Sequence, residues 1–449
     1  MKIEDLIRIV EATVLQGKIS NKKFKKICID SRTVKKGDLF IAIIGKRLDG
    51  HQYISEALKK EPVAILVSNS EVIIPNKTIP VLYVPDTNQA LIQLGTYFRQ
   101  LYPIPVIAVT GSVGKTTTKN LIADLLATKF NVLRSPQNYN NRIGLPLTLF
   151  ELKETDQVMV VELGMNHLGE ISELSCMCRP NVAVITKIGT SHIGYVKGRK
   201  NILKAKLEIL DGMSDGYLVV NGFDPYLKKI KLEQIETLAI GRHSNLQLTD
   251  VQIYVDGTYF NIVYHGQKYP AYYPVPGEKM LENVLLAIQV ALLFQVPLEQ
   301  IVEVLRNYQT DSRRLEKTLL PGGITLIDDC YNASIESLEN DLSILNLVTG
   351  KKLLIFGDFL ELGRYAKKIH RQAARKIRRV KGLDVLLIGE ETKVMRRILK
   401  GAPYFKTAKE AICYLQQQDL TDRTILVKGS RKVGLEEVVT YLQEKKTRD

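Results

Sequence analysis

The segment Val106–Thr118, with the sequence VIAVTGSVGKTTT, constrains this chain more than any other feature. A short apolar run, typical of a buried strand, leads into a glycine-rich turn that ends in Lys115 and Thr116, and a helical pattern follows. In such a unit, backbone N–H groups and a helix N-terminus face an anion, the lysine adds a charge, and the threonine hydroxyl can hold Mg²⁺. The segment predicts a nucleoside triphosphate site. Its predicted nucleotide-binding residues are Thr110, Gly111, Ser112, Val113, Gly114, Lys115, Thr116 and Thr117.

This phosphate loop departs from the common pattern at one position. The common pattern has glycine five residues before Gly114, where this chain has Val109, so the loop takes a shorter form. The alternative is a glycine turn that only connects a strand to a helix. We disfavour this alternative because the strand, Lys115 and Thr116 all stand in register.

Length and composition indicate a globular protein of several domains. A chain of 449 residues exceeds one ordinary core, and its apolar and charged fractions of 45% and 25% are typical of globular proteins. No run of about 18 apolar residues occurs, and the first residues do not resemble a signal peptide, so we expect no membrane span and a cytoplasmic location. The five scattered cysteines favour a reducing compartment with free thiols.

The net charge of +15 raises the hypothesis of a nucleic-acid partner. The basic residues are dispersed, however, and the densest runs, at 22–26 and 375–381, lie far apart with few aromatic residues between the cations. Each run is more typical of a solvated basic surface. We expect no nucleic-acid partner, and a general attraction for small polyanions.

The order of apolar and polar segments predicts an α/β protein of three domains. Short strands and helices fill residues 1–102, a Pro-flanked hinge follows, and residues 103–312 alternate strands and helices as a mostly parallel sheet requires. Residues 245–272 have alternating apolar residues and a turn, which predicts an antiparallel excursion. A second α/β pattern fills residues 313–449.

Three polar residues of the central domain follow predicted strands. Thr116 follows the first strand, Glu162 ends the next, and His192 follows a third. Because ligands bind beyond the carboxyl ends of such strands, these three side chains could surround one Mg²⁺ that bridges phosphate oxygens. An imidazole is an unusual Mg²⁺ ligand, so a structural role for His192 stays open. By pattern alone, Lys206 is a lysine on a helix surface.

Polar loops mark two further candidate binding regions. Residues 138–144 are rich in amides, which suit a sugar-like or phosphate-bearing substrate but also occur in ordinary loops. In the last domain, the loops at 328–332, 357–363 and 428–431 each follow a predicted strand, and together they predict a second ligand-binding face.

At these motifs the chain resembles the Mur ligases, the ATP-dependent amide-bond-forming enzymes of peptidoglycan precursor synthesis, over nearly its whole length. The phosphate loop matches the short form of this family, including Val109. The strings ELGMNHLG from Glu162 and GDFLELG from Gly357 are typical of the MurF type, which joins D-Ala-D-Ala to a UDP-N-acetylmuramoyl-tripeptide. The resemblance implies three α/β domains: a small uridine-nucleotide domain (1–102), an ATP domain (103–312) and a Rossmann-like C-terminal domain (313–449).

The resemblance also implies roles for single residues. Lys115 would contact the ATP phosphates, Thr116 and Glu162 would hold one Mg²⁺, His192 would hold a second, and Lys206 would be carried as a carbamate that ligates Mg²⁺. Lys115, Glu162, His192 and Lys206 are thus the expected catalytic set. Further nucleotide contacts are expected from Asn283, Arg314 and Asp329. Substrate contacts are expected from Ser31, Arg32, Asn138, Tyr139, Asn140, Asn141, Tyr331, Asn332 and Asp358.

Several positions depart from the family pattern. Lys187 replaces an asparagine, Lys279 replaces a histidine, Arg313 replaces a glycine, and Ser334 replaces the second asparagine of Asn-Ala-Asn-Pro. We expect an active monomeric enzyme with altered substrate contacts. The alternatives are a sister ligase that adds a single amino acid, a non-catalytic nucleotide-binding paralogue, and a nucleic-acid-dependent ATPase. The Asp-Asn-Pro motif usual in the sister ligase that adds the third residue is absent from the sequence.

Overall fold

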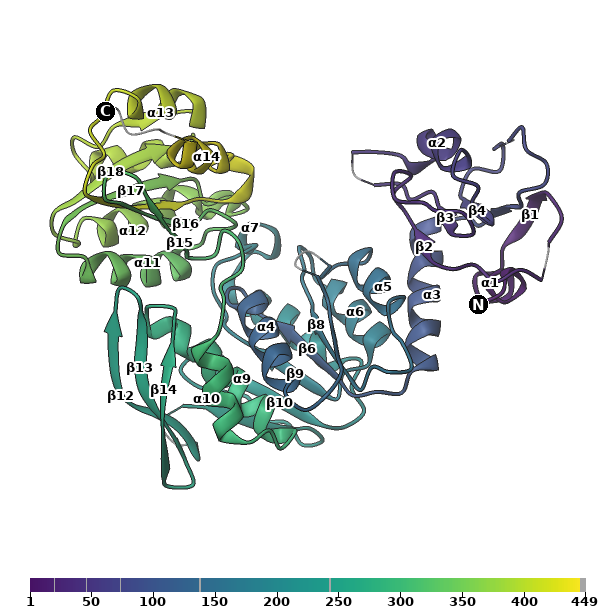
Figure 1. Cartoon of the computed structure of the whole chain (residues 1–449), viewed down its shortest axis with the longest axis horizontal. Coiled ribbons are helices and arrows are strands. Elements are labelled where there is room, and N and C mark those ends of the chain that lie inside the picture. Colours follow the sequence, from purple (N-terminus) through teal and green to yellow (C-terminus); the bar gives the residue numbers. More distant parts are fainter. Residues whose placement is uncertain (20, 46, 73, 137–138, 242–243, 445–449) are drawn as a thin grey trace.

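Three α/β units follow one another along the chain in the computed structural model, with the central unit between the other two (Figure 1). The structure describes residues 1–444 except 20, 46, 73, 137–138 and 242–243. Each unit contains its own sheet, as the three-domain α/β prediction required. Among the described residues, no helix is both long enough and apolar enough to cross a membrane.

The central unit contains a six-stranded, all-parallel sheet in the order β11-β10-β9-β6-β8-β7. Its strands are β6 (Val106–Thr110), β7 (Val132–Arg134), β8 (Val158–Glu162), β9 (Val182–Ile185), β10 (Tyr217–Asn221) and β11 (Glu236–Ile240). Both faces of a parallel sheet are covered, and every residue of the inner strands β6 and β8 is buried, whereas the edge strands β7 and β11 are partly exposed. The carboxyl ends of β6, β8 and β9 therefore meet at one edge.

Helices on both faces of this sheet complete the central unit. They are α4 (Lys115–Leu126), α5 (Gly144–Leu149), α6 (Glu170–Cys178), α7 (Ile193–Val196), α8 (Arg199–Leu207), α9 (Glu278–Leu293) and α10 (Leu298–Arg306). An antiparallel sheet of β12 (Leu246–Tyr254), β13 (Gly257–Tyr264) and β14 (Gln267–Tyr273) packs against α9 and α10. The predicted antiparallel excursion at 245–272 is therefore confirmed.

The N-terminal unit has a five-stranded sheet in the order β1-β5-β4-β3-β2, of which only the β1–β5 pair is antiparallel. Its strands are β1 (Thr13–Gln16), β2 (Ile27–Cys28), β3 (Leu39–Ile41), β4 (Ala64–Val67) and β5 (Val81–Tyr83). Its helices are α1 (Ile3–Val10), α2 (Ile54–Leu58) and α3 (Thr87–Leu101). Helix α3 contacts α5 and α6, and so joins this unit to the central one (Figure 1).

The C-terminal unit has a six-stranded sheet in the order β15-β16-β20-β17-β18-β19, parallel except for the β15–β16 pair. Its strands are β15 (Glu316–Leu320), β16 (Ile324–Asp329), β17 (Lys351–Gly357), β18 (Leu383–Ile388), β19 (Tyr404–Phe405) and β20 (Arg423–Lys428). Its helices are α11 (Ile335–Leu347), α12 (Ala366–Ile377), α13 (Ala408–Leu415) and α14 (Glu436–Glu444). One apolar core cluster contains residues of both this unit and the central one.

A buried imidazole fixes the turn after β17. His370 of α12 is fully buried, its Nε2 accepts a hydrogen bond from the Phe359 backbone N–H at 3.1 Å, and its Nδ1 lies 2.9 Å from the Ala366 carbonyl. Burial lowers the pKa of His370 below its ordinary 6.5, although Asp358 and Glu391 favour the charged ring. The folded protein therefore favours the neutral imidazole, whose unprotonated Nε2 can accept the hydrogen bond from Phe359.

We expect stability to depend on this ring as the pH falls. Because the folded pKa of His370 is below the unfolded value of 6.5, its contribution is complete above that pH and is lost as the unfolded chain takes up a proton below it. The melting temperature should fall between about pH 7.5 and about pH 5.5, and should fall less in His370→Gln, whose amide can still accept from Phe359. If the melting temperatures of the wild type and His370→Gln fell equally with pH, the pH dependence could not be assigned to His370.

Candidate active site

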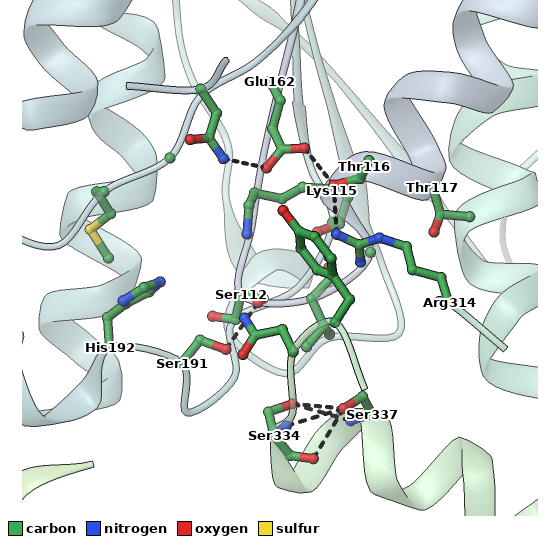
Figure 2. A pocket seen from close by; sticks show the side chains of 18 of the residues that line it. Ser112, Lys115, Thr116, Thr117, Glu162, Ser191, His192, Arg314, Ser334 and Ser337 are labelled. Atoms are coloured by element: carbon green, nitrogen blue, oxygen red, sulfur yellow. Dashed lines mark hydrogen bonds between the residues drawn. The ribbon is translucent and has the colours of Figure 1, made fainter. Parts of the chain in front are cut away.

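A cavity of about 960 Å³ opens at the carboxyl ends of the central strands. All three units contribute to its lining: Asp86 and Asn88 from the N-terminal unit, the phosphate loop from the central unit, and Asp329 and Tyr331 from the C-terminal unit. Figure 2 shows the central part of this cavity, with Lys115, Glu162, His192 and Arg314 directed toward it. The structure thus brings residues that are hundreds of positions apart in sequence to one site.

Backbone contacts hold the phosphate loop against the strand-end loop at 186–191. The Ser112 N–H donates to the Lys187 carbonyl at 2.8 Å, and the Thr186 hydroxyl donates to the Val113 carbonyl at 2.6 Å. Gly114 has a φ of +83°, and a Cβ there would overlap the Asn283 amide. Val109, which replaces the glycine of the common pattern, is a fully buried residue of β6.

Thr116 and Glu162 meet at the start of α4. The Thr116 hydroxyl donates to Glu162 Oε2 at 2.6 Å, and the Asn140 amide donates to Glu162 Oε1 at 2.8 Å (Figure 2). The Arg314 guanidinium reaches the Thr116 hydroxyl oxygen from the C-terminal unit at 3.0 Å. Only 3% of Glu162 is exposed, and its carboxylate is held between two neutral donors, Thr116 and Asn140.

Two lysines face this carboxylate. Desolvation lowers the pKa of Lys115, against the opposing effect of Glu162. Lys206 is 1% exposed, and burial, reinforced by the charge of Lys115, lowers its pKa well below the ordinary value of 10.5. The interpretation of Lys206 as a surface lysine is therefore wrong: α8 turns this side chain inward, next to the phosphate loop.

His192 lies at the boundary with the C-terminal unit. It has a φ of +61°, and its Nδ1 lies 2.7 Å from Oε2 of Glu361. The neighbouring imidazole lowers the pKa of Glu361. Two residues further on, the Gly194 N–H donates to the Glu361 carbonyl at 3.0 Å. His192 is thus engaged with the C-terminal unit rather than in direct contact with Thr116 or Glu162.

The C-terminal wall of the cavity is built around Tyr331 and Lys428. The Tyr331 ring lies between two guanidinium groups, with Arg314 at 4.4 Å and Arg431 at 5.6 Å from its centroid. Lys428 is fully buried between Asp329 and Asp341; burial opposes its charge, but the two carboxylates outweigh burial and raise its pKa. This lysine therefore stays charged and fixes Asp329 at the cavity.

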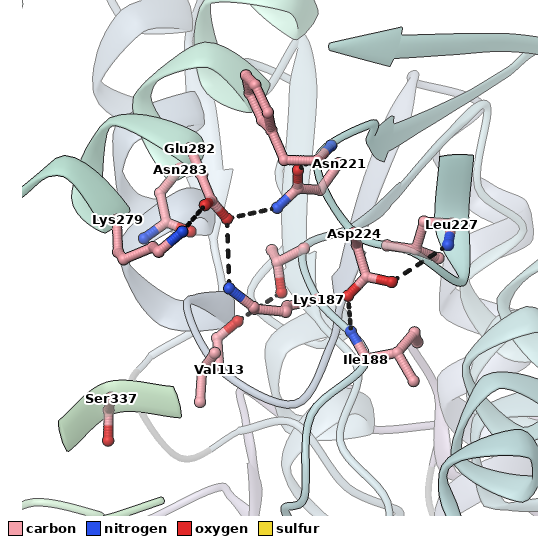
Figure 3. Close-up of polar contacts among 12 residues, drawn as sticks. Val113, Lys187, Ile188, Asn221, Asp224, Leu227, Lys279, Glu282, Asn283 and Ser337 are labelled. Carbon is pink, nitrogen blue, oxygen red and sulfur yellow. Dashed lines mark hydrogen bonds and ion pairs between the residues drawn. The ribbon is translucent and has the colours of Figure 1, made fainter. Parts of the chain in front are cut away.

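The two family departures Lys187 and Lys279 meet at one carboxylate. Glu282 of α9 lies 3.5 Å from Lys187 Nζ and 3.1 Å from Lys279 Nζ, and it accepts a hydrogen bond from the Asn221 amide at 2.7 Å (Figure 3). All but Asn221 line the cavity. Glu282 offsets one of the two positive charges that Lys187 and Lys279 bring, so the three side chains form one linked group.

Other residues predicted at the site are placed as follows. Asn140, Asn141 and Asn332 line the cavity with Thr117 and Asn283, whereas Tyr139 and Asp358 are not among its lining residues. The Asp358 carboxylate accepts from the Thr392 N–H at 2.8 Å within the C-terminal unit. Asn138 lies outside the described residues.

Ser31 and Arg32 lie in the N-terminal unit, away from the cavity lining. The Ser31 hydroxyl donates to Glu56 at 2.7 Å, and the exposed Arg32 pairs with Asp30 at 2.6 Å. Their predicted role with a uridine nucleotide remains a prediction.

Sequence reasoning missed three residues of this site. Glu361 and Arg431 belong to strand-end loops that the sequence marked as polar, so their loops could have singled them out. Asn340, which lines the cavity from the middle of α11, carries no such signal.

The donor set suits Mg²⁺ only in part. Thr116 and Glu162 offer the oxygen ligands that Mg²⁺ prefers, next to a loop that cradles phosphates. In the described part of the chain, no three His, Cys, Asp or Glu side chains converge as a metal site. Mg²⁺ would thus take much of its coordination from phosphate and water, and Lys206 would fit it as an oxygen ligand only after conversion to a carbamate.

Comparison with known proteins gives a consistent result. Three family models match the chain. The Mur ligase family catalytic domain matches residues 23–99, the Mur ligase middle domain matches residues 109–291, and the Mur ligase glutamate ligase domain matches residues 313–431. The UDP-N-acetylmuramoyl-tripeptide–D-alanyl-D-alanine ligase of Bacillus subtilis is 34% identical, over 96% of this chain and 97% of its own. The enzyme of the same name from Escherichia coli is 30% identical, over 94% of each chain.

A solved structure extends the likeness to three dimensions. The crystal structure of MurF from Acinetobacter baumannii matches with a TM-score of 0.91 and 30% identity, over 99% of each chain. The likeness therefore covers all three units. The chain belongs to the Mur ligase family.

Proposed function

We propose that this protein is an ATP-dependent, ADP-forming ligase that joins D-Ala-D-Ala to a UDP-N-acetylmuramoyl-tripeptide. The single observation that carries the proposal is the cavity, in which a phosphate loop with Lys115 and a Thr116–Glu162 pair meet walls from both neighbouring units. Relatives with this activity in their names cover nearly the whole chain.

We assign one substrate to each unit. Residues 1–102 would bind the uridine nucleotide with Ser31 and Arg32, residues 103–312 would bind ATP, and residues 313–449 would bind the dipeptide with Tyr331 and Asn332. All three units of one chain line the cavity, which is consistent with a monomer as the active form. We propose that this monomer acts in the cytoplasm.

The reaction would proceed through an acyl phosphate. The donor carboxylate attacks the γ-phosphorus of ATP and ADP leaves; the amine of the dipeptide then attacks the acyl carbon and phosphate leaves. Lys115 lies where it can offset charge on the transferred phosphoryl group, which is the main task of a catalyst for this step. Water would hydrolyse the acyl phosphate, so the His192–Glu361 contact, which holds the C-terminal unit against the site, serves to exclude it.

Mg²⁺, held by Thr116, Glu162 and a carbamate on Lys206, would neutralise phosphate charge when bound. The Lys206 amine is suited to this modification because burial lowers its pKa and so favours the neutral, nucleophilic form. Attack on CO₂ forms an N–C bond, breaks one C=O π bond and releases one proton to solvent. The product is an anion next to the Lys115 ammonium.

Phosphate release from ATP, assayed over a matrix of donors and acceptors, tests the proposal. We expect release only with UDP-N-acetylmuramoyl-tripeptide and D-Ala-D-Ala together. Release with a shorter donor and a free amino acid would assign a sister ligase instead. Nucleotide binding without turnover in any combination would assign a non-catalytic paralogue, and stimulation by DNA or RNA would assign a nucleic-acid-dependent ATPase.

A further inference from the structure

We propose that Asn340 reads the base of the bound nucleotide and selects adenine, in the cavity that Lys279 and Glu282 also line. The inference rests on the proposed function insofar as it takes the cavity to bind ATP. It assigns a specificity-determining role to a residue in the middle of a helix of the C-terminal unit.

The amide of Asn340 lacks partners. The residue is 5% exposed, and neither its Oδ1 nor its Nδ2 has a hydrogen-bond partner within the described residues. A buried polar group left unpaired costs about 1–3 kcal/mol, and native proteins almost always satisfy such groups. Because Asn340 lines the cavity, a molecule bound in the cavity can supply the missing partners.

The position of Asn340 relative to the phosphate loop suits a nucleoside. Its amide packs on Gly277, directly before α9, and a Cβ at Gly277 would overlap it. Further along α9, Asn283 packs on Gly114 of the phosphate loop. Six residues of helix separate these two contacts, or roughly 9 Å along the axis. A nucleotide with its phosphates at Gly114 would therefore extend its nucleoside along α9 toward Asn340.

The wall of α9 that faces Asn340 is polar and fixed. Glu282 is held by Lys187, Lys279 and Asn221, and Figure 3 shows this group together with Ser337 of α11. Lys279, Glu282 and Ser337 line the same cavity as Asn340. Lys187 and Lys279, which depart from the family pattern, thus lie where the nucleoside is expected.

The chemistry of an amide fits adenine. An asparagine side chain presents an acceptor and donors side by side, and adenine presents its N6 amino donor next to its N7 acceptor, so two parallel hydrogen bonds can form along this edge. Hypoxanthine carries a carbonyl in place of that amino group. The carbonyl oxygen would face the amide oxygen, and one hydrogen bond would be lost. We expect discrimination of about ten-fold or more.

Calorimetric titration with ADP and IDP in the presence of Mg²⁺ tests the inference on the full-length protein. The wild type should bind ADP about ten-fold or more tightly than IDP, and Asn340→Ala should lose this preference by weakening ADP more than IDP. Mg²⁺-dependent binding of both nucleotides that persists in the variant shows that the fold and the phosphate end are intact. Asn307→Ala, at an exposed asparagine after α10, is the matched control and should behave as wild type.

An Asn340→Ala variant that keeps the wild-type preference for ADP would overturn the inference. If this variant also had a raised KM for D-Ala-D-Ala, the Asn340 amide would be assigned to the acceptor dipeptide instead. Either result can coexist with full ligase activity, whereas a wild type that binds neither nucleotide would contradict the proposed function itself.

Discussion

Replacing Lys115 by methionine should lower kcat by about 10²- to 10³-fold while leaving the fold intact. The expected loss follows from removing one preorganised positive group from a transferring phosphoryl group, because such groups act at the point where charge develops. Methionine retains most of the apolar stem. The measurement is the rate of phosphate release with saturating donor, dipeptide and ATP.

The stability of Lys115→Met should not fall with its activity. Desolvation already lowers the pKa of Lys115, so the folded protein holds this ammonium at a cost. The melting temperature of Lys115→Met should therefore equal or exceed that of the wild type. Lys153→Met, at an exposed turn, is the control for loss of a lysine and should leave both quantities unchanged. Near-normal turnover in Lys115→Met would refute the role assigned to this residue.

The second large effect concerns Lys206. Lys206→Met should also lose about 10²-fold or more in kcat, and in addition the wild type should lose activity when CO₂ is removed and regain it with bicarbonate. The variant should not respond to bicarbonate, because it has no amine to carboxylate. Lys204→Met, at an exposed lysine of the same helix α8, provides the matched control.

A direct observation separates modification from a merely structural role. Protein equilibrated with ¹³C-bicarbonate should show one carbamate resonance by NMR that is present in Lys204→Met and absent from Lys206→Met. Wild-type activity that is indifferent to CO₂, together with no such resonance, would mean that Lys206 acts as a free amine.

The phosphate loop and the central sheet could be predicted because their signals are local. Apolar runs such as Val158–Glu162 mark buried strands, and the glycine, lysine and threonine of one short segment are contiguous in sequence. The residues that pair across the cavity were harder to find. Glu361 meets His192 only because the C-terminal unit folds back onto the central one, and no local pattern encodes that contact.

Sequence reasoning misplaced Lys206 and missed Asn340 for the same physical reason. Lys206 and Asn340 are polar residues on helices, and helical periodicity assigns polar positions to solvent. Here both side chains are buried instead: Asn340 lines the cavity between units, and Lys206 lies close to the charges of Lys115 and Glu162. Short strands such as β7 and β19 carried too few residues to show a period of two. The sequence therefore predicted the elements of the site better than the orientation of its helices.

The most direct test of the central claim follows one oxygen atom. The donor tripeptide is labelled with ¹⁸O in both oxygens of its terminal carboxylate and is allowed to react with ATP and D-Ala-D-Ala. If the carboxylate attacks the γ-phosphorus, each released phosphate carries one ¹⁸O, because the oxygen that bridges carbon and phosphorus leaves with the phosphate. Product formation with unlabelled phosphate would contradict the acyl-phosphate mechanism.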